Sequence, residues 1–151
     1  MRTIGLIALC LWIIASGSSC NDSAQVTQAI PKGPVNINID LNLPSYMHLA
    51  NVGTHAYFEG GVKGVIVIHD FDDQWYAFER GCAFEPMSTC SLIWADSVEL
   101  QLMCGNWVGG QFDPCCESRY TFAGFPLKGP ARGRLAQYMV QRNANQVLVY
   151  N

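Results

Sequence analysis

Histidine is scarce in this sequence and absent where the cysteines are. The chain of 151 residues has three histidines, His48, His55 and His69, and none follows His69. Five of the seven cysteines lie after that point. The three histidines also lack the spacing of metal ligands, and no Ser-His-Asp set, phosphate-binding loop or carboxylate pair stands out. Enzymatic activity is therefore not predicted.

Positive charge is scarce as well. The chain has 9 lysines and arginines against 12 aspartates and glutamates. Arg2 lies ahead of the N-terminal apolar run, in a segment expected to be removed. Without Arg2 the chain has 8 basic and 12 acidic residues, which is a net charge of −4. This balance argues against electrostatic binding of nucleic acid or of anionic lipid. We expect no nucleic-acid partner.

Helical periodicity is missing after residue 20, and apolar side chains alternate with polar ones instead. Alternation over residues 35–41 predicts a strand with one buried face, and the apolar run at residues 65–68 (VIVI) is typical of a central strand. Further strands are predicted over residues 74–79, 98–104, 135–141 and 147–150, with a turn at residues 142–146. Short strands with frequent glycine and proline turns predict a small all-β domain, an antiparallel sandwich or barrel.

A long apolar run occurs only near the N-terminus. Residues 4–14 (IGLIALCLWII) follow Arg2 and precede small residues at positions 15–19. This order predicts a signal peptide over residues 1–19, since a permanent membrane span needs about 20 apolar residues. Residues 20–34 are polar with two prolines and are interpreted as a tether. The β domain is expected over residues 35–151.

The end of the signal segment resembles a bacterial lipoprotein signal, because small residues lead to Cys20 and polar residues follow it. The resemblance implies cleavage before Cys20 and acylation of its sulfur, which would attach the mature protein to a membrane by lipid. We therefore expect an exported, membrane-anchored lipoprotein of the bacterial cell envelope, facing the periplasm or the cell surface. Ordinary cleavage that leaves Cys20 as a free thiol is the alternative.

Two stretches in the second half of the chain stand out, residues 76–82 (YAFERGC) and residues 115–140 (CCESRYTFAGFPLKGPARGRLAQYMV). Together they resemble a Rieske [2Fe–2S] domain. The first is similar to that family's approach to its first ligand loop, and the second to its second loop, proline loop and next strand. The most specific match is a Gly-Pro-Ala loop followed by a Leu-x-x-Tyr-x-Val strand, here residues 129–131, Leu135, Tyr138 and Val140. The resemblance implies two ligand loops at one tip of a small Rieske-like antiparallel β sandwich or barrel.

Only one of the four ligands of a Rieske cluster has the expected residue type at the matching position of this sequence. The first cysteine falls on Cys82, but the first histidine falls on Phe84. The second cysteine falls on Asp113, the second histidine on Cys116, and the glycine after it on Glu117. Because a Rieske cluster needs two imidazoles on one iron, the resemblance with these departures predicts that the [2Fe–2S] cluster is lost and that no metal or cofactor is bound.

The resemblance also implies a disulfide between the two loops, and Cys90 and Cys115 fall near its positions. Cys116, in place of the second histidine, would face Cys82, and a second disulfide there would close the vacated cavity. Cys104 is left over, and other pairings of these five cysteines stay open. Oxidation is expected in an exported chain.

Other uses of the cysteines are open alternatives. An electron-transfer protein would hold a [2Fe–2S] cluster on Cys82, Cys104, Cys115 and Cys116, and a zinc site would use the same thiols. Adjacent Cys115 and Cys116 point in different directions on an extended backbone, which argues against this set. A thiol–disulfide enzyme would use the same adjacent pair but prefers a Cys-x-x-Cys at a helix N-terminus, which the chain lacks.

Residues 106–112 (NWVGGQF) look like an insertion in the second loop, where Trp107 and Phe112 either contact a partner or pack as a lid over the cavity. Taken with the lipoprotein signal, the resemblance implies a membrane-anchored Rieske-like domain without its cluster. We predict that it acts as a disulfide-stabilised binding or structural module of the cell envelope. An envelope protein is the partner expected at the loop tip.

Overall fold

The computed structural model describes residues 29–151, so the signal peptide, Cys20 and most of the tether lie outside the described residues. The described chain is built from ten strands and one short 3-10 helix, η1 (Met47–Ala50), which lies between β1 and β2. The strands are β1 (Asn36–Asp40), β2 (Thr54–Phe58), β3 (Val65–His69), β4 (Trp75–Glu79), β5 (Leu92–Asp96), β6 (Gln101–Val108), β7 (Gln111–Tyr120), β8 (Pro126–Lys128), β9 (Met139–Asn143) and β10 (Gln146–Tyr150). In this part of the chain no helix is long and apolar enough to cross a membrane.

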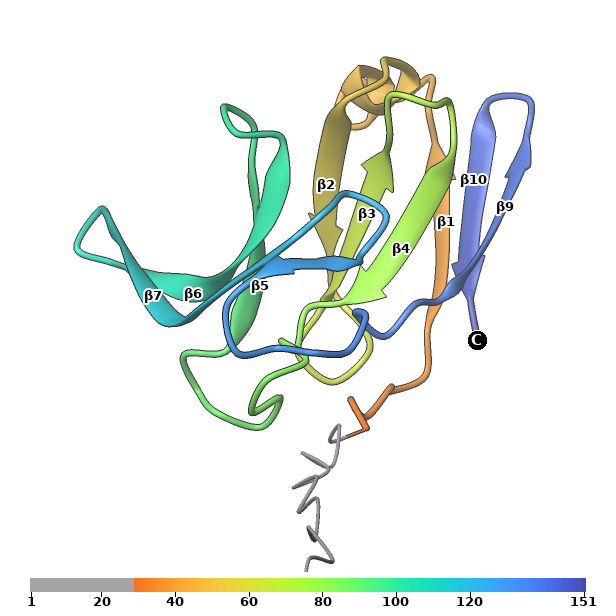
Figure 1. The fold of residues 1–151 in the computed structure, drawn as a ribbon. Helices are drawn as coiled ribbons and strands as arrows, with labels where there is room; N and C mark the ends of the chain where they lie inside the picture. Colours follow the sequence, from red (N-terminus) through yellow and green to blue (C-terminus); the bar gives the residue numbers. More distant parts are fainter. Residues whose placement is uncertain (1–28) are drawn as a thin grey trace, which may run out of the picture.

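Three antiparallel sheets make up the domain, with the strand orders β1-β10-β9, β2-β3-β4 and β5-β6-β7-β8. Figure 1 shows β2-β3-β4 in the middle, with β1, β10 and β9 on one side and β5, β6 and β7 on the other. The antiparallel all-β fold predicted from the alternating sequence is confirmed.

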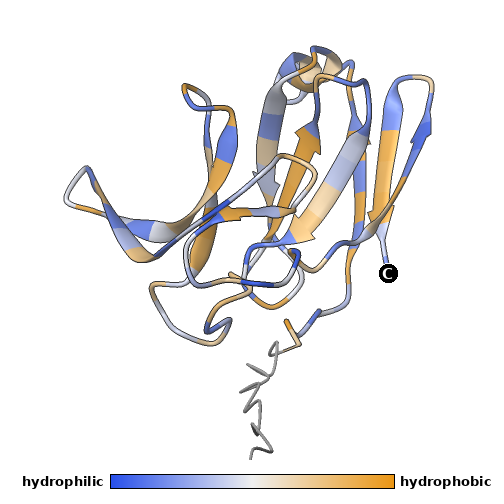
Figure 2. Cartoon of the chain, in the orientation of Figure 1, coloured by the Kyte–Doolittle hydropathy of each residue, from blue (hydrophilic) through white to orange (hydrophobic). Residues whose placement is uncertain are grey.

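The central strand of the middle sheet, β3, is buried on both faces because its side chains are apolar on both sides. Every residue of β3 is buried, and Figure 2 shows this strand in hydrophobic colours. Val65 and Val67 pack in one core with Ile39, Val147 and Val149 from β1 and β10. Ile66 and Ile68 pack on the opposite side, in a core with Phe78, Ile93, Leu102 and Tyr120. The run at residues 65–68 is therefore the central strand that its composition predicts.

Two predicted strands begin in the wrong place. Residues 97–100 form a turn, and Val98 is 87% exposed. The Asp96 carboxylate accepts the backbone N–H of Val98 at 3.0 Å and of Glu99 at 3.1 Å, and Leu100 has a φ of 54°. A side chain that bonds the backbone two residues ahead favours a turn over a ladder. The strand therefore starts at Gln101.

The segment predicted as a strand over residues 135–141 is divided between two sheets. Its first part pairs with β4. The Ala136 carbonyl accepts the backbone N–H of Glu79 at 2.9 Å, and the backbone N–H of Tyr138 donates to the Ala77 carbonyl at 2.8 Å. The chain then crosses to the other sheet and continues as β9. The turn to β10 contains only residues 144 and 145, fewer than predicted.

The last residues of the predicted tether lie against the domain. Ile30 packs against the core that contains Ile66. The carbonyl of Gly33 accepts hydrogen bonds from Asn151 Nδ2 at 3.0 Å and from the Tyr138 hydroxyl at 3.4 Å. The segment before β1 is thus held beside the C-terminus.

Candidate functional site

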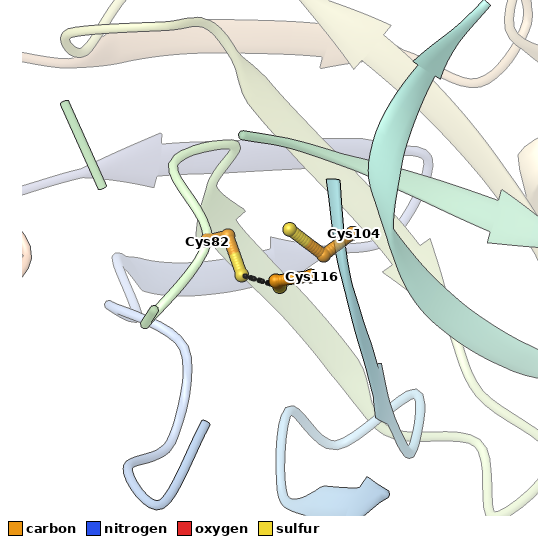
Figure 3. Close-up of side chains that lie close together, drawn as sticks. All are labelled: Cys82, Cys104 and Cys116. Atoms are coloured by element: carbon orange, nitrogen blue, oxygen red, sulfur yellow. Dashed lines mark hydrogen bonds between the residues drawn. The ribbon is translucent and has the colours of Figure 1, made fainter. Parts of the chain in front are cut away.

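Three cysteine side chains meet in the core beside the middle sheet. Cys82 follows β4, Cys104 lies on β6 and Cys116 lies on β7. Their Sγ atoms all lie within 4.8 Å of one another, and Cys82 Sγ is 3.5 Å from Cys116 Sγ. Figure 3 shows the three side chains directed into the same space. Cys82 and Cys104 are buried and Cys116 is half-buried, so this three-cysteine cluster lies almost wholly inside the protein.

A bulge in β7 creates this arrangement. Strands β6 and β7 pair at Met103 with Arg119 and again at Gly105 with Pro114, so Cys104 alone on β6 lies opposite residues 115–118 on β7. The surplus residues arch out of the ladder. Glu117, at the middle of the arch, has a φ of 56°. The Rieske pattern has glycine at this position, which agrees with the left-handed backbone found here.

Cys115, next to Cys116 in the bulge, points elsewhere and forms a disulfide with Cys90. The two Cα atoms are 5.6 Å apart, and the residues are 25 positions apart in the sequence. This is the pair that the resemblance implied. It ties the loop after β4 to β7, so the two segments that carry Cys82 and Cys116 are held together covalently.

The other implied disulfide is not formed in the structure. Cys82 and Cys116 are free thiols, and their sulfurs, at 3.5 Å, are farther apart than the bond length of about 2.05 Å. The four-cysteine set proposed for an iron–sulfur cluster or zinc does not assemble either, because Cys115 is bonded to Cys90. Cys104, left over in the expected pairing, is the third member of the cluster.

Asp113, at the second cysteine position of the Rieske pattern, lies on β7 outside the three-cysteine cluster. Asp113 is exposed, and it pairs with Asn106 on the β6–β7 hairpin. Phe84, at the first histidine position, packs half-buried against the core that contains Cys82 and Cys104. The signal for Cys104 was present in the sequence, since it follows Leu102 on the buried side of an alternating strand.

Residues 106–112 form the tip of the β6–β7 hairpin. Trp107 pairs with Phe112 across the two strands, and Gly109 and Gly110 make the turn with φ values of 59° and 83°. Trp107 is 48% exposed and Val108 61% exposed. Figure 1 shows the hairpin extending away from the middle sheet. The lid interpretation is therefore wrong, and the tip presents apolar side chains to solvent.

Two buried hydroxyl groups contact the sulfurs. Tyr120 Oη lies 3.3 Å from Cys82 Sγ and accepts the N–H of Ala83 at 3.3 Å. Ser118 Oγ lies 3.1 Å from Cys116 Sγ and accepts the N–H of Ala131 at 3.2 Å. Because Ala131 ends the Gly-Pro-Ala loop, the two cysteine loops and that loop converge at one place, as the resemblance implied.

The three thiols hold their protons unequally. Hydrogen bonds from the Cys104 and Cys82 thiols lower the pKa of Cys116, and the Ser118 hydroxyl adds to this effect. The same contacts with Cys116 and Cys82, together with burial, raise the pKa of Cys104. Burial also raises the pKa of the Tyr120 phenol. The contacts among the three thiols therefore shift the pKa values of Cys116 and Cys104 in opposite directions.

No family model matches the sequence, and no curated protein matches it. Among solved structures, the plasma membrane Rieske protein PetC3 from the cyanobacterium Synechocystis PCC 6803 is similar, with a TM-score of 0.55 and 19% sequence identity over 76% of this chain and 99% of its own. The domain has a Rieske fold. The ferredoxin of carbazole 1,9a-dioxygenase from Nocardioides aromaticivorans IC177 also matches, at 20% identity and a TM-score of 0.47 over 78% of this chain and 96% of its own.

The cysteine cluster of this Rieske fold does not fit a Rieske [2Fe–2S] centre. Such a centre needs two thiolates on one iron and two imidazoles on the other. The cluster contains three sulfurs and no imidazole, because the histidines lie on η1, β2 and β3. The buried imidazole of His69 contacts the Leu49 carbonyl at 2.9 Å and Asp73 Oδ1 at 2.7 Å. Ligands of two irons must also lie on either side of the metal pair, whereas these sulfurs are all within 4.8 Å of one another.

Proposed function

We propose that this protein is an exported, lipid-anchored Rieske-fold domain that has lost its [2Fe–2S] cluster and acts as a disulfide-stabilised binding module of the cell envelope. One observation carries the proposal. Three cysteines gather in the core between the two loops that resemble Rieske ligand loops, and no histidine is among them. A fold that keeps its loops but replaces the imidazoles keeps its shape and loses the ligands of an electron carrier.

The β6–β7 hairpin tip is the surface that we propose for a partner. Trp107 and Val108 are exposed there. The Trp107 and Phe112 rings pack edge-on, with their centroids 5.5 Å apart. Aromatic side chains are enriched in protein interfaces because they bury much apolar area at small entropic cost. The Cys90–Cys115 disulfide at the base of the same hairpin limits the motion of its strand. The partner expected is a protein of the envelope.

The metal content of the purified protein tests the loss of the cluster. Protein isolated without oxygen is expected to be colourless, with far less than one iron and one acid-labile sulfide per chain. A Rieske protein with its two cysteines and two histidines, purified in the same way, is the positive control. Two iron atoms and two sulfides per chain, with visible absorption and an EPR signal after reduction, would contradict the proposal and support electron transfer instead.

Membrane attachment through Cys20 is tested separately. The wild-type protein is expected in the membrane fraction, released only by detergent, whereas Cys20→Ala is expected to shift most of the protein to the soluble envelope fraction. The reason is that the sulfur of Cys20 would carry the lipid, and acyl chains supply about 0.8 kcal/mol of membrane binding for each buried CH₂. Ser23→Ala, three positions along, is the matched control and should stay in the membrane fraction. If Cys20→Ala still sediments with membranes, the anchor lies elsewhere.

A further inference from the structure

The three-cysteine cluster has the arrangement of ligands around one metal ion. We propose that Cys82, Cys104 and Cys116 bind a single cuprous ion, Cu(I), in a three-coordinate thiolate site. The inference rests on the proposed function, since the same sulfurs are not free for copper if a two-iron cluster is present. The inference assigns a bound metal ion to a cysteine cluster that would otherwise have only a structural role.

The distances suit one ion. With a metal–sulfur distance of about 2.3 Å, three sulfurs spaced evenly around an ion lie about 4 Å apart. The closest measured pair, Cys82 and Cys116, is 3.5 Å apart, and no pair exceeds 4.8 Å. The three ligands come from the loop after β4, from β6 and from β7, and the Cys90–Cys115 disulfide holds two of these segments together.

The number and softness of the ligands favour Cu(I). Thiolates select Cu(I), zinc and iron–sulfur clusters over harder metals. Structural zinc sites almost always have four protein ligands, but among the described residues no fourth cysteine, histidine, aspartate or glutamate joins the cluster. Cys82 is 0% and Cys104 1% exposed, so water as a fourth ligand could approach only from the side of Cys116, which is half-buried. Cu(I), with a filled d shell and a single charge, is satisfied by three sulfurs.

Polar and charged groups next to the cluster can stabilise the negative charge of the thiolates. The Tyr120 hydroxyl lies 3.3 Å from Cys82 Sγ, where it can donate to thiolate sulfur as outer-shell groups do in metal sites. The Cys116 thiol donates to Ser118 Oγ at 3.1 Å, so a second hydroxyl contacts the cluster. The Lys63 ammonium donates to the Ser91 carbonyl at 3.3 Å, and Ser91 Oγ lies 4.0 Å from Cys104 Sγ. This lysine places a positive charge on the same side of the cluster as Cys104.

Binding is an exchange of protons for copper. Each thiol that becomes a ligand releases its proton to solvent, the copper stays cuprous, and no oxidant or reductant is needed. Oxidation of Cys82 and Cys116 to a disulfide by an added two-electron oxidant would instead transfer two electrons to that oxidant, release two protons and leave only Cys104 as a thiol. The two states exclude each other, so an oxidised preparation is expected to bind no copper until it is reduced.

Anaerobic titration with Cu(I), supplied as its acetonitrile complex in competition with bicinchoninate, tests the site. The protein carries Cys10→Ser and Cys20→Ser, so that the sulfurs of the cluster are its only free thiols. One Cu(I) per chain is expected, with X-ray absorption showing three sulfurs at about 2.3 Å. Mature wild-type protein, in which the sulfur of Cys20 would carry the lipid, is the matched control and should take up the same one ion in the cluster.

Cys104→Ser and Cys116→Ser are each expected to weaken Cu(I) binding by at least about 100-fold, because the loss of an inner ligand exceeds the 10–100-fold effect of outer-shell changes. Circular dichroism and thermal unfolding of each variant establish that it is folded. Failure to bind Cu(I), unchanged affinity in both folded variants, or preference for Zn²⁺ with four ligands would overturn the inference. Iron and sulfide in the protein as isolated would overturn the proposed function. Iron-free protein that does not bind Cu(I) would overturn this inference alone.

Discussion

Replacing Cys90 and Cys115 together by serine is expected to lower the free energy of unfolding by about 3 kcal/mol. The disulfide joins residues 25 positions apart, so in the unfolded chain it removes the freedom of a loop of that length. A small domain has a total stability of about 5–15 kcal/mol, and the loss is therefore a large part of it. The melting temperature should fall by about 10 °C.

Chemical denaturation of the wild type and of the double variant, each with and without a reductant, provides the measurement. The reductant should destabilise the wild type to the level of the double variant and should leave the double variant unchanged. A wild type that resists the change, while mass spectrometry shows its disulfide reduced, would contradict the prediction. A second loss of stability in the double variant would reveal a disulfide between Cys82 and Cys116, which are free thiols in the structure.

Glu79→Gln is expected to lower the free energy of unfolding by about 3 kcal/mol, because hydrogen bonds to a charged group contribute about 1.5–3 kcal/mol and a buried group left unpaired costs more. The Glu79 side chain is 0% exposed. Its carboxylate accepts the N–H of Val62 at 2.8 Å, the N–H of Lys63 at 2.7 Å and the Tyr138 hydroxyl at 2.7 Å. All three partners are donors, and the amide of glutamine would direct a donor at one of them.

The position of Glu79 explains why replacing one carboxylate oxygen by an amide nitrogen is expected to change stability so much. It stands at the end of β4 and holds the turn between β2 and β3 to the segment that leads into β9. The Cβ of any residue larger than glycine at position 61, where φ is 65°, would collide with this carboxylate. The burial of the Tyr138 hydroxyl beside the carboxylate raises the pKa of Tyr138, so this donor keeps its proton.

Tyr138→Phe and Glu99→Gln are the comparisons for Glu79→Gln. Tyr138→Phe removes one donor and leaves the two backbone contacts, so a loss of about 1 kcal/mol is expected. Glu99 is exposed on the turn before β6, and Glu99→Gln should change stability by less than about 0.5 kcal/mol. Urea unfolding of the three variants would count against this account if Glu79→Gln were as stable as Glu99→Gln.

The alternation of apolar residues predicted the fold well because it is a local property. In β3 both sides are apolar, and such a strand is stable only between two packed layers, so its central position followed from four residues. The Rieske resemblance also led to the right loops, since the Gly-Pro-Ala segment and the cysteines are close in the structure. The strand predicted from residue 98 failed because the Asp96 carboxylate bonds the chain into a turn, and alternation alone does not register that bond.

The membership of the cysteine cluster could not be read from spacing. Cys104 lies in the middle of an ordinary alternating strand, 12 positions before Cys116 and 22 positions after Cys82. Only the pairing of β6 with β7 shows that residues 106–112 fold back on themselves and return the chain to the same place. Asp113, which the resemblance places at a ligand position, lies on the exposed part of that hairpin.

By itself, the sequence determined the all-β class and the lack of imidazole ligands, because both follow from which residues are present and how they alternate. The tertiary structure decided which sulfurs meet. Cys115 and Cys116 are adjacent, and a bulge with a left-handed residue at Glu117 turns one toward Cys90 and the other toward Cys82 and Cys104. Strand register and a bulge depend on the packing of two sheets around a shared core, and no local pattern contains that information.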